Sequence, residues 1–275
     1  MPGTLYVVAT PIGNLEDCSP RAVRILSEVA LIACEDTRHT RKLLDHFGIN
    51  THLVSYHDHN ERDRAAELAL RLTSGESLAL VSDAGTPLIS DPGYRLVDAA
   101  LDAGAAVVPI PGPNAAITAL SASGLPTDAF YFGGFLAPKE GQRRRQLEQA
   151  APLAATLIFY EAPHRILETL EEIEAICPHR PVVLARELTK LHEEFLRGSA
   201  AALRTTLAAR PAIKGEFTIL LGKPVEPEAP SDTRPIPEAV GDLEKQGLSR
   251  MDAIKRVARE RGLPKRDVYN QVEGR

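Results

Sequence analysis

The chain has 275 residues, 44% of them hydrophobic, and a formal net charge of −5. This length can hold two domains with a core in each, and no apolar run reaches the roughly 18 residues that a membrane span needs. The negative charge argues against a protein that coats nucleic acid indiscriminately, although it leaves room for a local basic surface. Three widely spaced cysteines and the lack of a basic-then-apolar leader predict a cytoplasmic protein without a disulfide framework.

Short apolar segments alternate with helical patterns through the first half of the chain. Strands are predicted at residues 5–9, 29–34, 53–56, 77–81 and 105–110. Helices are predicted at residues 20–27, 61–72, 94–103 and 115–122. Strands that alternate with helices predict an α/β fold with a parallel, doubly wound sheet.

Gly124-Leu125-Pro126 breaks this alternation and predicts a domain boundary. Beyond it the predicted strands are more closely spaced, which favours a mixed sheet. They lie at residues 130–135, 156–160, 182–186, 195–197 and 217–221. Prolines and acidic residues then predict a stiff linker. The expected domains are residues 1–123, residues 124–223, a linker at 224–237 and a basic helical module at 238–275.

The segment 82–93 carries two acids, two glycines and two prolines in twelve positions. It lies between a buried strand and a helix, at the carboxyl end of that strand. Ligands bind at this edge of open α/β sheets, whereas an ordinary surface turn is the alternative interpretation. A tight turn does not need so many special residues, so the pattern favours a ligand-binding loop.

The loops also indicate what kind of ligand they bind. The loop after the first strand has one glycine, Gly13, where a dinucleotide fingerprint needs three, and no P-loop motif is present. Loops built from Pro, Asp, Thr and Ser favour a ligand without phosphate groups and with a positive charge. S-adenosylmethionine, which carries a sulfonium and an amino-acid end, fits this description.

Histidines are frequent between His39 and His59, and the segment 57–59 has the sequence His-Asp-His. A third and a fourth metal ligand are not evident, so we predict no metal site. The charged segment 35–40 follows a strand directly. It can form either a structural ion pair or a group that faces the substrate.

Two basic segments are candidates for contact with nucleic acid. The span 245–266 has eight basic residues against two acidic ones, and helix 250–261, turn 262–264 and helix 265–271 resemble a helix-turn-helix. The helix around Arg143-Arg144-Arg145 can be a solvated face or can meet phosphates. Small helical pairs also serve as docking modules, so the shape alone does not decide.

Six motifs that occur in a fixed order along the chain indicate its family. They are VATPIGNL at 8–15, EDTRHT at 35–40, VSDAGTPLISDPG at 81–93, PIPGP at 109–113, FYEAPHR at 159–165 and KGEF at 214–217. Together they closely resemble the bacterial 16S ribosomal RNA (cytidine-2′-O)-methyltransferases, a family of the tetrapyrrole methylase superfamily, or class III methyltransferases. The resemblance covers about residues 4–223, and the tail is similar to the small helical region that such proteins often carry.

The resemblance implies two α/β domains with S-adenosylmethionine in the cleft between them, usually in a homodimer. It implies a cytidine ribose in the decoding region of 16S ribosomal RNA as substrate, within naked RNA or an assembled small subunit. By position, the implied cofactor contacts are Pro11, Asp83, Thr86, Ile89, Ser90, Asn114, Ala115, Tyr160, Glu161, Ala185, Glu216 and Phe217. The pair Phe217-Thr218 departs from the family pattern, and we expect it to affect only adenosine packing.

Two sets of residues remain to be assigned. Asp36, His39 and Glu161 are candidates for a base that accepts the hydroxyl proton, and neither the residues nor the resemblance chooses among them. The candidate RNA contacts are Arg38, Arg143, Arg144, Arg145, Lys255, Arg256, Arg259, Lys265 and Arg266. Two other functions stay open at this point: a tetrapyrrole C-methyltransferase of the precorrin type, and a nucleic-acid-binding regulator without enzymatic activity.

Overall fold

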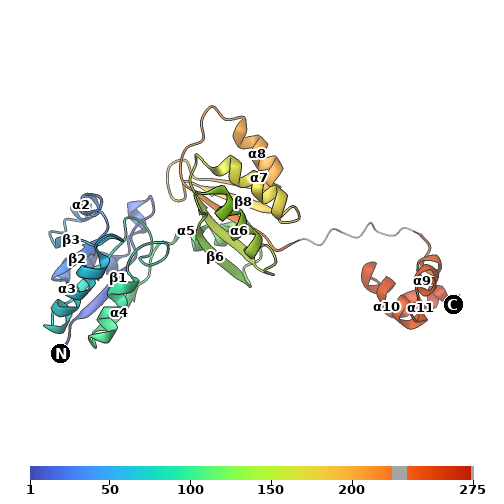
Figure 1. The fold of residues 1–275 in the computed structure, drawn as a ribbon, viewed down its shortest axis with the longest axis horizontal. Helices are drawn as coiled ribbons and strands as arrows, with labels where there is room; N and C mark the ends of the chain where they lie inside the picture. The colour runs from blue at the N-terminus through green and yellow to red at the C-terminus, as the bar shows by residue number, and fades with distance from the viewer. Residues whose placement is uncertain (225–233, 274–275) are drawn as a thin grey trace. The chain divides into compact units, whose positions relative to one another are not determined.

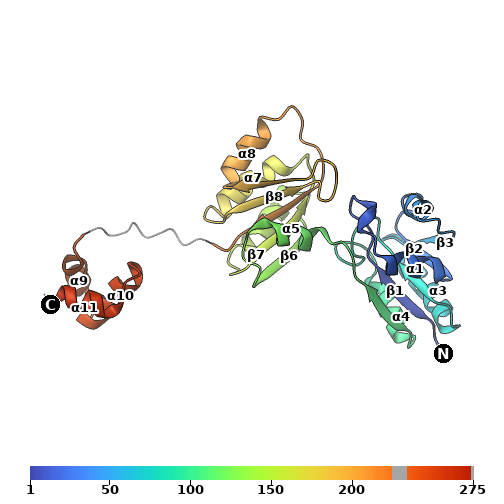
Figure 2. The same cartoon turned by 180° about the vertical axis from the view of Figure 1, so that it is seen from behind.

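The computed structural model describes residues 1–224 and 234–273. The chain forms two compact units, Met1–Lys223 and Pro224–Arg275. The larger unit contains two β-sheets with helices packed on them, and the smaller unit is helical (Figures 1 and 2). Two α/β sheets, the first parallel and the second mixed, confirm the predicted fold class.

The first sheet is parallel throughout. Its strands are β1 (Thr4–Val8), β2 (Leu31–Cys34), β3 (His52–Ser55), β4 (Leu78–Leu80) and β5 (Ala106–Ile110). Their order is β3-β2-β4-β1-β5, so the chain runs outward from β1 to β3 and then returns through β4 to β5. The carboxyl ends of β1 and β4 are therefore neighbours, and an isolated bridge joins Thr10 to Gly85 there.

Helices cover both faces of this sheet, which is why its strands are nearly continuous apolar runs. One face packs against α1 (Pro20–Glu28) and α2 (Thr37–His46) through Ile25 and Leu44. The other face packs against α3 (Glu61–Thr73) and α4 (Tyr94–Asp102). A 3₁₀ turn, Leu15–Asp17, precedes α1.

Helix α2 is absent from the helices predicted by the sequence pattern. Asp36 caps it by accepting a hydrogen bond from the backbone N–H of Arg38, and only Thr40 and Leu44 are buried. Few of its residues are apolar, but Leu44 and Phe47 recur at helical spacing against the core, and the Asp36 cap and Gly48, with a φ of 68°, mark its two ends. Residues 37–40 therefore form the first turn of a helix.

The second sheet is mixed and has the order β6-β7-β10-β8-β9. Its strands are β6 (Phe130–Phe135), β7 (Thr156–Glu161), β8 (Val182–Arg186), β9 (Glu194–Gly198) and β10 (Phe217–Leu221). Only β6 and β7 pair in parallel; the other neighbours are antiparallel. The helices α6 (Glu140–Ala150), α7 (Ile166–Ile176) and α8 (Ala200–Ala208) pack on one face.

Helix α5 (Ala115–Ser123) packs on the opposite face of the second sheet. Ala116, Ala119 and Leu120 lie in one apolar cluster with Ile158 of β7 and Val183 of β8. The division between the sheets thus falls before this helix, whereas the sequence-based division at 123/124 assigns it to the first sheet. Helix propensity cannot indicate which sheet an apolar helix covers.

The second unit contains three helices in its described part. They are α9 (Ile236–Lys245), α10 (Arg250–Glu260) and α11 (Lys265–Val272). They share a small core of their own around Val240, Ile254 and Val268. None of the described helices is long and apolar enough to cross a membrane. Most of the predicted linker, residues 225–233, lies outside the described residues.

Candidate active site

The loop after β4, residues 82–93, is held in an unusual backbone conformation. Leu88 and Ser90 have φ angles of 71° and 67°, and Gly93 has φ 148°. A side chain at Gly93 would meet the Cδ2 atom of Leu80 at 2.9 Å, so this position requires glycine. Positive φ at residues other than glycine is costly and is concentrated at functional sites.

Two loops bring the sheets together at the carboxyl end of β1. A side chain at Gly13 would overlap Lys190, so the loop after β1 lies directly against the loop that follows β8. That second loop also contains positive φ angles, at Glu187 and Thr189. The hydroxyl oxygen of Tyr160, from β7, accepts a 3.1 Å hydrogen bond from the N–H of Ala116 at the start of α5. These contacts fix the two sides of the site relative to each other.

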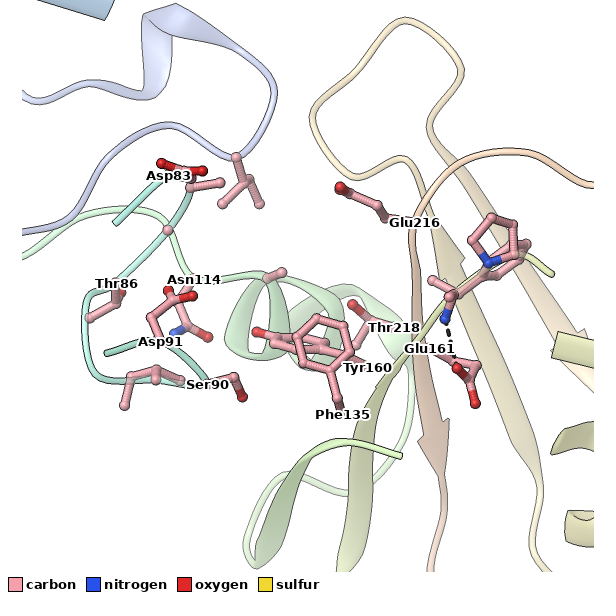
Figure 3. Close-up of a pocket in the computed structure, with 18 residues that line it drawn as sticks. Asp83, Thr86, Ser90, Asp91, Asn114, Phe135, Tyr160, Glu161, Glu216 and Thr218 are labelled. Atoms are coloured by element: carbon pink, nitrogen blue, oxygen red, sulfur yellow. Dashed lines mark hydrogen bonds between the residues drawn. The ribbon is translucent and has the colours of Figure 1, made fainter. Parts of the chain in front are cut away.

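A cavity of about 330 Å³ lies between these loops, within the size range of ligand-binding pockets. The first-sheet side supplies Asp83, Thr86, Ser90 and Asp91, as Figure 3 shows. The opposite side presents Tyr160 and Phe135, whose ring centroids are 5.2 Å apart, together with Glu216, Phe217 and Thr218. The cavity therefore has a polar wall and an aromatic wall.

The charge of this cavity has one sign. The described residues that line it include the acids Asp83, Asp91, Glu161 and Glu216 and no Lys, Arg or His. Glu161 and Glu216 form ion pairs with basic residues outside the cavity, so Asp83 and Asp91 supply most of its negative charge. Burial raises the pKa of Asp91 to about 6, with further increases from Glu35 and Asp83, while a hydrogen bond with Ser82 opposes them. The chemistry of this lining suits a ligand with a positive charge and an apolar ring, and it does not suit phosphate groups.

Most of the implied cofactor residues meet in this cavity. They are Asp83, Thr86, Ile89, Ser90, Asn114, Ala115, Tyr160, Glu161, Glu216 and Phe217. Pro11 instead lines the neighbouring cavity described below. Ala185 is buried in the apolar cluster beneath α5 and does not line either cavity. Sequence reasoning did not assign Asp91 or Phe135 to the cofactor, although Asp91 lies in the loop that it singled out.

A second cavity, of about 350 Å³, adjoins the first. The two share Ile12, Asp83, Ala84 and Glu216 in their walls. The second cavity extends toward α2, which contributes His39, Thr40, Lys42 and Leu43. Lys190 also lines it, and its ammonium group forms ion pairs of 2.9 Å with both Glu187 and Glu216. Unlike the first cavity, this one contains basic side chains.

The three candidate bases have different surroundings. Asp36 forms a 2.9 Å ion pair with Arg38, and hydrogen bonds from Arg38 lower the pKa of Asp36 to about 2. The Glu161 side chain is fully buried and is held by Arg165, by the hydroxyl of Thr169 and by the N–H of Ala162. Figure 3 shows its carboxylate turned away from the other cavity residues. His39 is exposed and lines the second cavity.

The basic helix α6 differs from its sequence-based interpretation at one position. Arg143 is 1% exposed and forms a bidentate contact with Glu172, at 2.9 and 2.8 Å. Its guanidinium is therefore enclosed between α6 and α7 and does not reach a phosphate group at the surface, contrary to its expected contact with RNA. Arg144 and Arg145 are exposed, and Arg144 pairs with Glu148 of the same helix.

The histidine-rich segment forms no evident ligand set in the described part of the chain. The rings of His57 and His59 are in edge contact, with centroids 5.9 Å apart. Across the residues described, no group of three or more His, Cys, Asp or Glu side chains is arranged to hold a metal ion. The absence of a metal requirement stays a prediction.

Comparisons with known proteins agree with this architecture. Residues 4–204 match the family described as Tetrapyrrole (Corrin/Porphyrin) Methylases. The chain is 52% identical to a Halalkalibacterium halodurans protein named Ribosomal RNA small subunit methyltransferase I, over 98% of this chain and 94% of that protein. A protein of the same name from Xylella fastidiosa is 51% identical over 98% of each chain.

Solved structures share the fold at low identity. Diphthine synthase matches with a TM-score of 0.61 and 14% identity, over 81% of this chain and 91% of that chain. Uroporphyrin-III C-methyl transferase from Thermus thermophilus, complexed with S-adenyl homocysteine, matches with a TM-score of 0.54 and 19% identity, over 80% and 97%. At these identities the likeness shows the fold alone.

Proposed function

Since this chain belongs to the tetrapyrrole (corrin/porphyrin) methylase family, we propose that it transfers a methyl group from S-adenosylmethionine to the 2′-hydroxyl of a cytidine in small-subunit ribosomal RNA. The observation that carries this proposal is the identity of about half of all positions, along nearly the whole chain, to proteins named Ribosomal RNA small subunit methyltransferase I. The cytidine and the decoding region come from the motif resemblance described above.

The first cavity fits this methyl donor. Its acids, Asp83 and Asp91 among them, complement the sulfonium and ammonium groups, and the described lining has no basic side chain that would repel them. Tyr160 and Phe135 offer aromatic faces to an adenine ring. Asn114, Thr86 and Ser90 add polar groups that can fix the orientation of the cofactor.

The chemistry asked of the chain is mainly positioning. When bound, S-adenosylmethionine supplies a methyl group on a positively charged sulfur atom, which is already a good leaving group. The chain must hold the ribose oxygen in line with that methyl group, and correct placement alone can supply ~7–11 kcal/mol of the barrier. A base that accepts the hydroxyl proton adds ~10²–10⁴-fold. We assign this role to His39, because Asp36 and Glu161 are held by ion pairs.

The second unit is proposed to bind RNA. Lys255, Arg256, Arg259, Lys265 and Arg266 are all exposed on α10 and α11. Lys255 and Arg256 pair with Asp252 and Glu260 one helical turn away, and such exposed pairs exchange readily for phosphate contacts. Arg38 and Arg145, both exposed on the larger unit, are further candidate contacts.

We also propose a homodimer that acts in the cytoplasm. The edge strand β6 exposes Phe130, Tyr131 and Phe135, at 46%, 41% and 59%, and an edge of this kind favours association. The three cysteines are free thiols, which suits a reducing compartment. Sedimentation velocity over a range of protein concentrations tests the dimer.

The test of the activity uses labelled S-adenosylmethionine with small subunits from cells that lack the gene. We expect label in 2′-O-methylcytidine after digestion to nucleosides and mass spectrometry. Label in a precorrin, with none in the RNA, would favour a tetrapyrrole C-methyltransferase. RNA binding without transfer to any acceptor would favour a regulator. Parallel assays on naked RNA and assembled subunits identify the form of the substrate.

A further inference from the structure

The second cavity differs from the first in the charge of its lining. The first has only acidic charged side chains among its described lining residues, whereas the second adds His39, Lys42 and Lys190 to Asp83 and Glu216. Lys190 forms ion pairs with Glu187 and Glu216 and so links the loops that carry them. Lys42 is exposed on α2 and has no hydrogen bond or ion pair among the described residues.

The position of this cavity suits an acceptor rather than a second part of the donor. Four residues, Ile12, Asp83, Ala84 and Glu216, line both cavities. A group bound in one cavity therefore lies next to a group bound in the other. Methyl transfer in line requires donor and acceptor on opposite sides of the moving carbon. Adjacent cavities, one with an acidic lining and one with a mixed lining, provide this arrangement.

The size and the lining indicate what the acceptor is. About 350 Å³ is at the low end of ligand pockets, enough for one nucleotide and too little for a duplex. Leu15, which is 40% exposed, and Leu43 offer apolar surface to a base. Enzymes that modify a base take its nucleotide out of the stack, and a cavity of this size can enclose one nucleotide only when that nucleotide is separated from its stacked neighbours.

We infer that the second cavity holds the target nucleotide of the RNA, unstacked, and that Lys42 binds a phosphate group beside it. This inference rests on the proposed function, and it adds a subsite and a contact residue to it. Arg38, which is exposed one turn earlier on α2, extends the same basic surface. Helix α2 is then the element that guides the RNA strand toward the shared wall.

The test compares Lys42→Gln with Arg62→Gln in the full-length protein. Arg62 is exposed on α3, lines neither cavity and has no described ion pair, so its substitution removes the same charge elsewhere. Lys42→Gln is expected to raise KM for the small subunit about tenfold. It should also lower the salt slope of binding by roughly 0.7–0.9, the value for one phosphate group. Cofactor affinity should stay unchanged, and Arg62→Gln should match the wild type.

A second variant tests the cavity itself. Leu15→Trp should fill it and lower methylation at least tenfold while calorimetry gives an unchanged cofactor affinity; Leu70→Trp, on the exposed face of α3, is the matched control. Weaker cofactor binding in Leu15→Trp would overturn the inference by assigning the cavity to the donor. An active wild type with an equally active Lys42→Gln would overturn it while the proposed function stands. A wild type that methylates no small-subunit RNA would refute the function and the inference together.

Discussion

At the scale of single residues, the charge of the first cavity depends on pH through Asp91. Its pKa of about 6 lies above the ordinary 3.8 because the carboxyl is buried near Glu35, Asp83 and Asp58. The raised pKa means that the folded state holds a proton that the unfolded state has lost between pH 4 and 6. The contribution of Asp91 to the free energy of unfolding is therefore largest below pH 4. It decreases as pH rises and is lost above about pH 6.

A cationic cofactor should reverse this balance, because it favours the ionised carboxylate. We expect cofactor affinity to fall by up to tenfold per pH unit as pH drops below about 6, with uptake of a proton on cofactor release. Asp91→Asn should remove this dependence, and Glu35→Gln should move its midpoint to lower pH. Calorimetry between pH 5 and 8 measures both. A pH dependence that persists in Asp91→Asn would contradict the assignment.

His39 is the residue whose substitution should affect the chemical step. We expect His39→Asn to lower kcat by ~10²–10⁴-fold, because the ribose hydroxyl then lacks the base that accepts its proton. Cofactor affinity should be unchanged, since His39 does not line the first cavity. His46→Asn, at the far end of the same helix, is the control. If kcat of His39→Asn lies within a factor of two of the wild-type value, His39 is not the base, and positioning of the substrates accounts for the rate.

At the scale of elements, the loop 82–93 forms much of one wall of the first cavity, and its backbone is strained at Leu88 and Ser90. Thr86 fixes the loop to the segment after β5, because its hydroxyl donates a 3.0 Å hydrogen bond to the carbonyl of Pro113. The loop can thus hold a ligand without help from a phosphate-binding glycine pattern. Its rigidity comes from the neighbours β1 and β5.

Filling this loop's side of the cavity should abolish cofactor binding. Thr86→Trp places a large ring in the first cavity, and we expect the cofactor Kd to rise at least 100-fold while thermal unfolding remains cooperative. Thr86→Ser keeps the hydroxyl and should bind the cofactor nearly as the wild type does. Unchanged affinity of Thr86→Trp in calorimetry would show that the cofactor lies elsewhere.

At the scale of the whole molecule, the helical unit has its own core and a charge unlike that of the complete chain. Residues 234–273 contain nine basic and seven acidic side chains, a net charge of +2, whereas the chain carries −5. The span 245–266 has an excess of six positive charges, and acids outside that span reduce it. Two of these acids form ion pairs with the span, Asp242 with Lys245 and Glu273 with Arg250. The unit is thus moderately basic.

Removal of this unit should weaken RNA binding only. We expect truncation after Pro224 to raise the Kd for the small subunit and to flatten its salt dependence by roughly 0.7–0.9 for each phosphate group that the protein no longer binds, with cofactor affinity unchanged. The full-length triple variant Arg259→Gln, Lys265→Gln and Arg266→Gln should give the same direction with a smaller effect. Titrations at several salt concentrations that coincide for all three proteins would leave the unit without a role in RNA binding.

The amino-acid pattern alone predicted the strands in chain order, most of the helices, a parallel first sheet and a mixed second sheet. Apolar runs of strand length and helix caps such as Ser19 and Ser199 depend only on neighbouring residues in the chain, so they can be recognised without the tertiary structure. The motif order also indicated the loops of the first cavity. The prediction missed helix α2 because most of its residues are polar, although the Asp36 cap and Gly48 mark its two ends.

Only the folded arrangement shows which side chains can act. Arg143 and Arg144 are neighbours in the chain, yet the turn of α6 directs Arg143 toward Glu172 and leaves Arg144 exposed. Glu161 and His39 were equal candidates until burial and ion pairing separated them. Helix α5 packs on the second sheet because its buried residues contact β7 and β8. Burial, partners and the sharing of walls between cavities depend on residues far apart in sequence, and no local pattern contains them.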